Sequence, residues 1–180
     1  KPQSYMIYGS LLVNEARVQS LSEQMPVVVT AVLTNPHLEK VEILEPFYSL
    51  EPMIREANGK KKECRWKLVG RRPREIVPGG SVQVHWHLEN SLEVGEYQVV
   101  LTPETGCLQA GVSIGAVRLS SAKLTISDQS YDPEWVAVFE RRLKMLQQDP
   151  AKMATSLVQQ LKEDPDNHPM RVDLVDVLEA

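Results

Sequence analysis

The pattern Gly111-Val112-Ser113-Ile114-Gly115 could make a serine nucleophile. In G-x-S-x-G motifs the serine sits on a sharp turn between a strand and a helix, which exposes its hydroxyl at the helix N-terminus. An aspartate and then His168 follow downstream, in the order that a catalytic triad of this kind needs. However, residues 116–121 contain no helix cap and are typical of an extended strand. We therefore favour a glycine-rich strand or loop around Ser113, and we predict that the protein is not an enzyme.

Two histidines are the best metal-ligand candidates. His85 and His87 occupy alternate positions, which places both imidazoles on one face of a strand. A stable metal site also needs a third ligand and hydrogen bonds that orient the rings. The sequence does not place His37 or His168 beside them. An exposed strand face is the simpler interpretation, so we predict no metal and no cofactor.

Positive charge is concentrated between residues 60 and 74, here called the basic segment. It holds eight basic residues against one acid, Glu63, so its charge is +7 and the remainder carries −11 of the overall −4. Clustered positive charge can bind nucleic acid, anionic lipid, acidic polysaccharide or an acidic protein. Lysines can equally protect a sheet edge from pairing with another chain. The candidate anion-binding residues are Lys60, Lys61, Lys62, Arg65, Lys67, Arg71, Arg72 and Arg74.

Composition places the chain among ordinary globular proteins. Of its 180 residues 42% are hydrophobic and 24% charged, which is enough for a packed core. No stretch approaches the roughly 18 apolar residues that a membrane helix needs.

Cys64 and Cys107 are too few for a disulfide framework, and the sequence leaves open whether they are bridged or separate thiols. The first residue is Lys1 rather than Met, so we expect that an N-terminal segment was removed, as a signal peptide would be, or was left out in cloning, and the sequence does not separate these two explanations. We expect a bacterial protein, periplasmic or secreted rather than cytoplasmic.

The elements that must position these residues are strands. A strand with one buried face shows apolar residues at every second position. This alternation predicts strands within 27–33, 64–68, 82–88 and 97–101, and again between 119 and 126. No helical period interrupts them between Val27 and Ile126. The pattern favours an antiparallel sandwich or barrel.

Turn residues separate these strands. Asn58-Gly59 predicts a two-residue hairpin of type I′, because both central residues of that turn need positive φ. Pro78-Gly79-Gly80 precedes the strand that begins near Val82.

The stretch Leu92-Glu93-Val94-Gly95-Glu96-Tyr97 resembles the tyrosine corner of immunoglobulin-like domains, in which the tyrosine bonds back across the preceding turn. The resemblance implies that Trp66 is the core tryptophan of such a domain. Val99 stands where antibody domains have a cysteine, so the resemblance is to the wider immunoglobulin-like or fibronectin-like class. Over residues 77–101 the chain is also similar to the β-sandwich family of bacterial intracellular proteinase inhibitors.

After Ser127 the pattern changes to a period near four, which indicates helices. Asp132-Pro133 and Asp149-Pro150 predict two helix starts, since an Asp cap accepts an orphan amide and proline has none to lose. A third helix is expected to be capped near Asn167. The predicted apolar stripes are Trp135, Phe139, Leu143 and Leu146 in the first helix, Met153, Leu157 and Leu161 in the second, and Met170, Leu174 and Leu178 in the third.

The end of the second helix resembles a tetratricopeptide repeat, in which Leu157 and Leu161 precede Glu163-Asp164-Pro165-Asp166-Asn167. Gln160 departs from the repeat, which has a small residue there. About three repeats are usually needed for stability, and this chain has about one and a half. Two explanations stay open: the chain is part of a longer helical array, or its helices lean on the sandwich through Trp135 and Phe139.

The predicted fold class is mainly β: an antiparallel immunoglobulin-like β-sandwich over residues 1–128, followed by about three short α-helices over 129–180 that form a partial tetratricopeptide-like unit. The predicted function is a non-enzymatic protein-interaction or scaffolding module, whose partner is another protein or a further part of the parent chain. Two alternatives stay open. One is a protease-inhibitor-like domain that offers a loop such as Arg71-Arg72-Pro73-Arg74, and the other is an anion binder that uses the basic segment. The oligomeric state is open.

Overall fold

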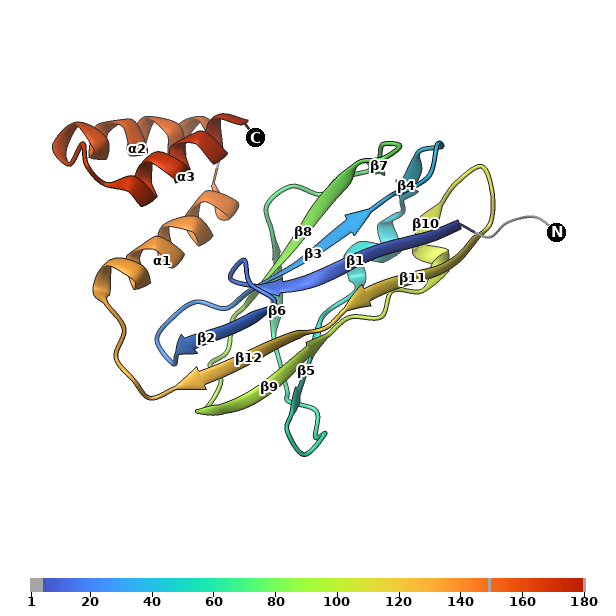
Figure 1. Cartoon of the computed structure of the whole chain (residues 1–180), viewed down its shortest axis with the longest axis horizontal. Coiled ribbons are helices and arrows are strands. Elements are labelled where there is room, and N and C mark those ends of the chain that lie inside the picture. The colour runs from blue at the N-terminus through green and yellow to red at the C-terminus, as the bar shows by residue number, and fades with distance from the viewer. Residues whose placement is uncertain (1–4, 149, 180) are drawn as a thin grey trace. The chain divides into compact units, whose positions relative to one another are not determined.

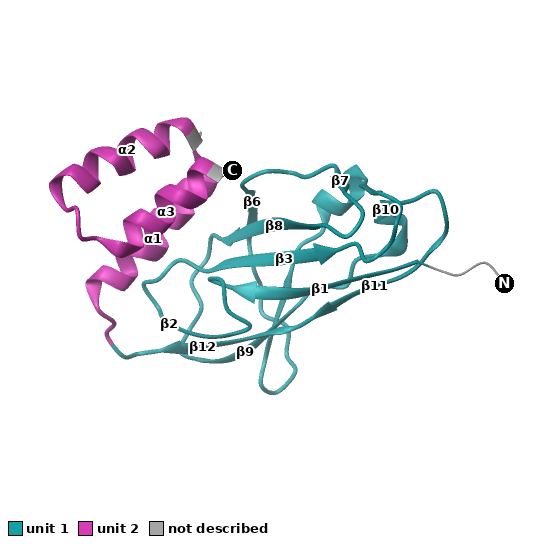
Figure 2. Ribbon diagram, turned by 45° about the horizontal axis from the view of Figure 1, so that its top comes forward, with its two compact units in different colours: residues 1–129 teal, residues 130–180 magenta. Residues whose placement is uncertain are grey.

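The structure is a computed structural model that describes residues 5–148 and 150–179. The chain divides into two compact units, Lys1–Gln129 and Ser130–Ala180 (Figure 2). Among the described residues, all strands belong to the first unit and the three α-helices belong to the second. The protein is therefore mainly β with three short helices at its C-terminal end, as predicted.

The first unit contains two large sheets and one small sheet (Figure 1). The large sheets have the strand orders β11-β1-β3-β8-β6 and β2-β12-β9-β5, and the small sheet has the order β10-β4-β7. The strands are β1 Tyr5–Val13, β2 Val18–Ser22, β3 Val28–Thr34, β4 Val41–Ile43, β5 Met53–Glu56, β6 Trp66–Val69, β7 Glu75–Ile76, β8 Ser81–Leu88, β9 Gly95–Val100, β10 Leu108–Gln109, β11 Ile114–Ser120 and β12 Ala122–Ser127. Two short 3-10 helices, η1 Glu45–Ser49 and η2 Thr105–Cys107, lie between them.

Alternation along the strands buries one face of each large sheet. In β3, Val29, Ala31 and Leu33 have no exposed surface. Trp86 of β8 is 1% exposed and donates its indole N–H to the carbonyl of Leu50 over 3.0 Å. Each strand predicted from an alternating pattern is therefore present. The apolar faces of β3, β8, β9 and β12 lie in the core, whereas Cys64, Trp66 and Leu68 are only half-buried.

Trp66 is half-buried rather than central. It lies on β6, which is an edge strand of its sheet and pairs on one side only, with Leu88 of β8 opposite. An edge position leaves one flank of the ring without a neighbouring strand. The prediction of a core tryptophan at position 66 is therefore wrong, and Trp86 has that role.

Most strand pairs are antiparallel, but two are parallel. β1 pairs with β11, and β2 pairs with β12. The first two strands and the last two strands each pass from one large sheet to the other, so the two ends of the unit run side by side in the same direction. The chain therefore passes between the two large sheets on this side, where β11 and β2 are the terminal strands, and β5 and β6 are the terminal strands at the opposite edges.

The turn at Asn58-Gly59 differs from the predicted type. Gly59 has a φ of 83°, but Asn58 does not have positive φ. The amide of Gly59 donates to the carbonyl of Glu56, and the amide of Glu56 donates to the carbonyl of Lys60. This is a three-residue hairpin loop that ends in a left-handed glycine, and the Asn58 side chain accepts the Lys60 amide within it. The hairpin was predicted correctly, and its type I′ geometry was wrong.

Two further predicted local structures are present. Gly79 has a φ of 69° and follows Pro78, and the amide of Gly80 donates to the carbonyl of Val77, as in a type II turn. The hydroxyl of Tyr97 donates to the carbonyl of Glu93 over 2.7 Å. This hydrogen bond spans the turn before β9, as expected for a tyrosine corner.

The helices of the second unit are α1 Pro133–Gln147, α2 Pro150–Glu163 and α3 His168–Glu179. The carboxylate of Asp132 caps α1 by accepting the amide of Glu134, and the side chain of Asn167 caps α3 by accepting the amide of Met170. The predicted cap at Asp149 lies outside the described residues. None of the described helices is long and apolar enough to span a membrane.

Of the stripe predicted for the second helix, Met153 and Leu157 lie in the core of the unit, and Leu161 is half-buried. The stripes of the other two helices need correction. Trp135 is 57% exposed, and Val138, one turn later, is the buried residue of α1. Leu178 is 67% exposed, because α3 turns the face of Asp173 and Val177 inward instead.

Candidate functional site at the basic segment

The basic segment connects β5 and β6, each an edge strand of one large sheet, and then continues to β7. Its first residues run back along β5. The amide of Lys62 donates to the carbonyl of Ile54, and Arg55 pairs with Lys61. These lysines therefore cover the edge of β5, as the edge-protection interpretation of the segment requires.

Lys62 is held by acids from two other parts of the chain. Its ammonium group lies 3.5 Å from the carboxylate of Glu56 and 3.9 Å from that of Glu93. Desolvation alone would lower the pKa of Lys62, but these two carboxylates outweigh it and raise the pKa. Its charge is neutralised locally, so Lys62 is a poor candidate for binding an external anion.

Arg74 and Arg72 are also engaged. The guanidinium of Arg74 lies 2.9 Å from the carboxylate of Glu45, and that of Arg72 lies 5.7 Å from the ring centroid of Tyr48. The hydroxyl of Tyr48 donates to the carbonyl of Pro73. Burial raises the pKa of Tyr48, so the hydroxyl keeps the proton that it donates. Three contacts therefore fix this end of the segment to η1.

The other five basic residues are exposed, and they form no ion pair with any part of the chain that the structure describes. They are Lys60, Lys61, Arg65, Lys67 and Arg71. The candidate anion-binding set thus separates into three engaged side chains and five free ones. Lys62 and Arg74 are neutralised by acids that lie outside the basic segment, so the local charge of +7 overstates the charge that an anion would meet.

His85 and His87 share the face of β8 that points away from the inter-sheet core. Desolvation lowers the pKa of His85 to about 4 and also lowers the pKa of His87. Nδ1 of His85 lies 2.7 Å from the hydroxyl of Thr30. Across residues 5–148 and 150–179, no three histidine, cysteine or acidic side chains gather to hold a metal ion.

The remaining predicted candidates are dispersed. His37 stacks on Tyr5, with ring centroids 3.8 Å apart, and His168 begins α3. Ser113 is exposed, and strand β11 follows it where a nucleophile elbow needs a helix. Cys64 and Cys107 are free thiols, and burial raises the pKa of each.

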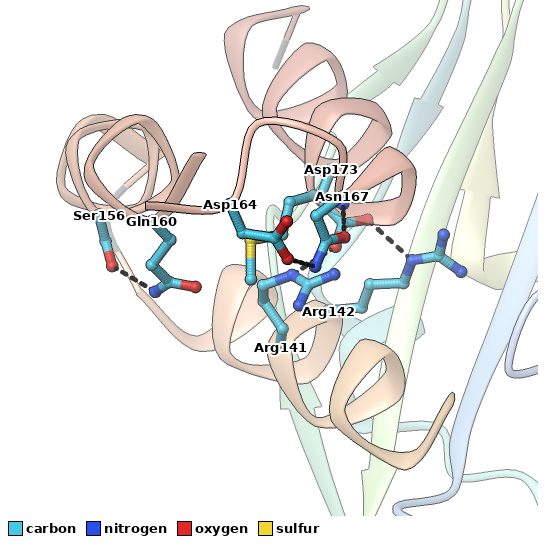
Figure 3. A network of polar contacts seen from close by, with 8 residues as sticks. Arg141, Arg142, Ser156, Gln160, Asp164, Asn167 and Asp173 are labelled. Carbon is cyan, nitrogen blue, oxygen red and sulfur yellow. Dashed lines mark hydrogen bonds and ion pairs between the residues drawn. The ribbon is translucent and has the colours of Figure 1, made fainter. Parts of the chain in front are cut away.

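A buried polar cluster in the second unit was not predicted (Figure 3). Asp173 of α3 has no exposed surface, and its carboxylate accepts Nε–H groups from Arg141 over 2.7 Å and from Arg142 over 2.9 Å. These contacts tie α1 to α3. The sequence did contain a signal for this cluster, because Asp173 stands four residues before Val177 on the inward face.

Comparisons with known proteins assign no family. No family model and no curated protein matches the chain. Among solved structures, the structural genomics target SoR45 is 16% identical, with a TM-score of 0.32 over 73% of this chain and 94% of that one. The fimbrial subunit MyfA of Yersinia enterocolitica is 12% identical, with a TM-score of 0.29 over 71% and 100%. The bacterial hydrophobin BslA is 9% identical, with a TM-score of 0.30 over 73% and 99%.

Proposed function

We propose that the protein is a non-enzymatic interaction module, in which an immunoglobulin-like sandwich is joined to a helical unit that binds further protein. The order β1-β3-β8-β6 in one sheet and β5-β9-β12 in the other corresponds to strands A-B-E-D and C-F-G of constant-type immunoglobulin domains. The hydrogen bond from Tyr97 to Glu93 also supports this assignment.

The observation that carries the proposal is a second apolar face on α3. One side of the helix packs Val177 into the core of its unit. The other side exposes Val172, Val175 and Leu178, which are 36%, 51% and 67% exposed. These residues are three apart, so they follow one another along one side of the helix. Aliphatic side chains grouped on the outside of a short helix favour coverage by another protein segment.

A photo-crosslinking residue placed at Val175 tests this role in cells that make the parent protein. We expect a protein adduct at Val175, because this side chain lies in the middle of the exposed apolar face. The matched control is the same residue at Lys152, an exposed polar position of α2. The adduct is identified by mass spectrometry. Equal labelling from both positions, or none from Val175, would contradict the proposal.

A second candidate function, anion binding, is favoured by the five free cations of the basic segment. We expect a Lys60→Ala, Lys61→Ala, Arg65→Ala variant to elute from heparin at lower salt than the wild-type protein. Each cation that binds an anionic group releases counterions. A variant with fewer such contacts releases fewer counterions, so its binding also depends less steeply on salt concentration. Lys40→Ala is the control, since Lys40 is exposed but paired with Glu42 and Glu75. Equal elution of all three proteins would remove anion binding from consideration.

A further inference from the structure

The connection between β6 and β7 presents one free arginine on a fixed backbone. Residues 70–74 form no strand or helix. Arg71 is exposed, and its side chain has no hydrogen bond or ion pair with any described residue. The residues after it are all held. It is therefore the single arginine of the connection whose guanidinium is free to enter another protein.

The backbone on both sides of Arg71 is anchored. Before it, Val69 is 6% exposed and pairs with His85 at the end of β6, and Gly70 turns the chain with a φ of 78°. After it, the carbonyl of Pro73 accepts the Tyr48 hydroxyl, and the carbonyl of Arg74 accepts the amide of Ile43 over 2.8 Å.

Side chains add two more anchors on the same side. The guanidinium of Arg72 lies over the Tyr48 ring, within the distance typical of cation–π contacts. Arg74 is paired with Glu45. A partner that binds Arg71 therefore meets a segment that has already lost much of its conformational freedom, and this lowers the entropic cost of binding.

We propose that this segment is a ligand for trypsin-like serine proteases, with Arg71 as the residue that enters the acidic primary pocket. Such pockets hold an aspartate that recognises a cationic side chain next to the reactive peptide bond. The proposal goes beyond the interaction role of α3 and does not depend on it.

The bond that a protease would attack is Arg71–Arg72. The serine oxygen bonds to the carbonyl carbon of Arg71, the carbon–nitrogen bond breaks, and the Arg72 nitrogen leaves with a proton from the catalytic histidine. Water then releases a carboxylate at Arg71, or the amine returns and the peptide bond re-forms. Because Tyr48 and Glu45 keep residues 72–74 in place, we expect return to compete with hydrolysis, so the protein inhibits and is cleaved slowly.

The test uses the whole chain with trypsin and a small chromogenic substrate. We expect reversible inhibition by the wild-type protein, retained in Arg71→Lys and at least tenfold weaker in Arg71→Ala. Arg65→Ala is the matched control, because Arg65 is an equally free arginine of the basic segment outside the anchored connection. Tyr48→Phe keeps the ring but removes the hydroxyl anchor, so this variant should be cleaved after Arg71 at least tenfold faster.

Inhibition that depends on Arg71 and cleavage that is accelerated by Tyr48→Phe would support the proposal. Three results would overturn it: no inhibition by the wild-type protein, equal inhibition by Arg71→Ala, or cleavage of the wild-type protein as fast as that of Tyr48→Phe. Mass spectrometry of the intact protein and its fragments identifies the bond that is cut.

Discussion

The Asp173→Ala variant is expected to lose about 3–5 kcal/mol of the free energy of unfolding of the helical unit. The carboxylate has no exposed surface and pairs with both Arg141 and Arg142. Removing one partner of a buried ion pair is costly, because the remaining charge stays desolvated without compensation. Arg141 already has a buried Nη2 without a hydrogen-bond partner among the described residues, so it has little means to re-pair.

This loss is large relative to the core that it affects. The buried apolar cluster of the unit consists of Met153, Leu157 and Val177, with partly buried residues around it. Met145 of α1 packs against this cluster, and the ion pairs with Asp173 add a second attachment of α1 to the rest of the unit. At the upper end of this expected loss, the helical unit of the Asp173→Ala variant would already be unfolded at 25 °C without denaturant.

Helical circular dichroism during urea unfolding measures the effect. Asp176→Ala is the control, since Asp176 is an exposed acid on the same helix and its loss should change stability by less than about 0.5 kcal/mol. Replacing Arg141 and Arg142 with Met and Asp173 with Leu should restore much of the stability, because well-packed apolar residues can substitute for a buried ion cluster. If Asp173→Ala were as stable as Asp176→Ala, the cluster would have no structural role.

The strands could be predicted because their signal is local. Val29, Ala31 and Leu33 alternate with less buried residues, and a period of two in sequence is a period of two in space. The tyrosine corner was also predictable, since the donor Tyr97 and the acceptor Glu93 are only four residues apart. The same holds for the cap of α1, in which Asp132 bonds to an amide two residues later.

Features that depend on distant residues could not be predicted in the same way. Which basic residues stay free depends on Glu45 and Glu93, which lie far from them in sequence. The choice between Trp66 and Trp86 as core tryptophan depends on which strand lies at a sheet edge, and alternation does not reveal strand order. Asp173 was not predicted, because the helical period of apolar residues does not indicate an acid on the inward face of a helix.

The stability of the first unit is expected to fall as the pH is lowered from 7.5 to 4, and His85 is the main cause. Its pKa is about 4 in the folded protein and 6.5 when unfolded, because desolvation disfavours the charged imidazole. Between these values the unfolded chain binds more protons, so the free energy of unfolding rises with pH and is lost on acidification. One unit of pKa corresponds to about 1.4 kcal/mol, so His85 removes about 2 kcal/mol by pH 5 and about 3 kcal/mol by pH 4.

The measurement is urea unfolding monitored by tryptophan fluorescence at several pH values for the wild-type protein and His85→Gln. Glutamine has no charged form in this range and can still hydrogen-bond to Thr30, so the variant isolates the titration from the contact. The free energy of unfolding of the wild-type protein, measured relative to that of His85→Gln, should fall by about 2 kcal/mol between pH 7.5 and pH 5. His87 is retained in both proteins. His168→Gln, which changes an exposed histidine of the second unit, is the control variant. If the free energies of unfolding of the wild-type protein and His85→Gln changed in parallel with pH, protonation of the His85 imidazole would cost nothing in the folded state. A neutral, desolvated His85 beside Thr30 would then be the wrong description of this face of β8.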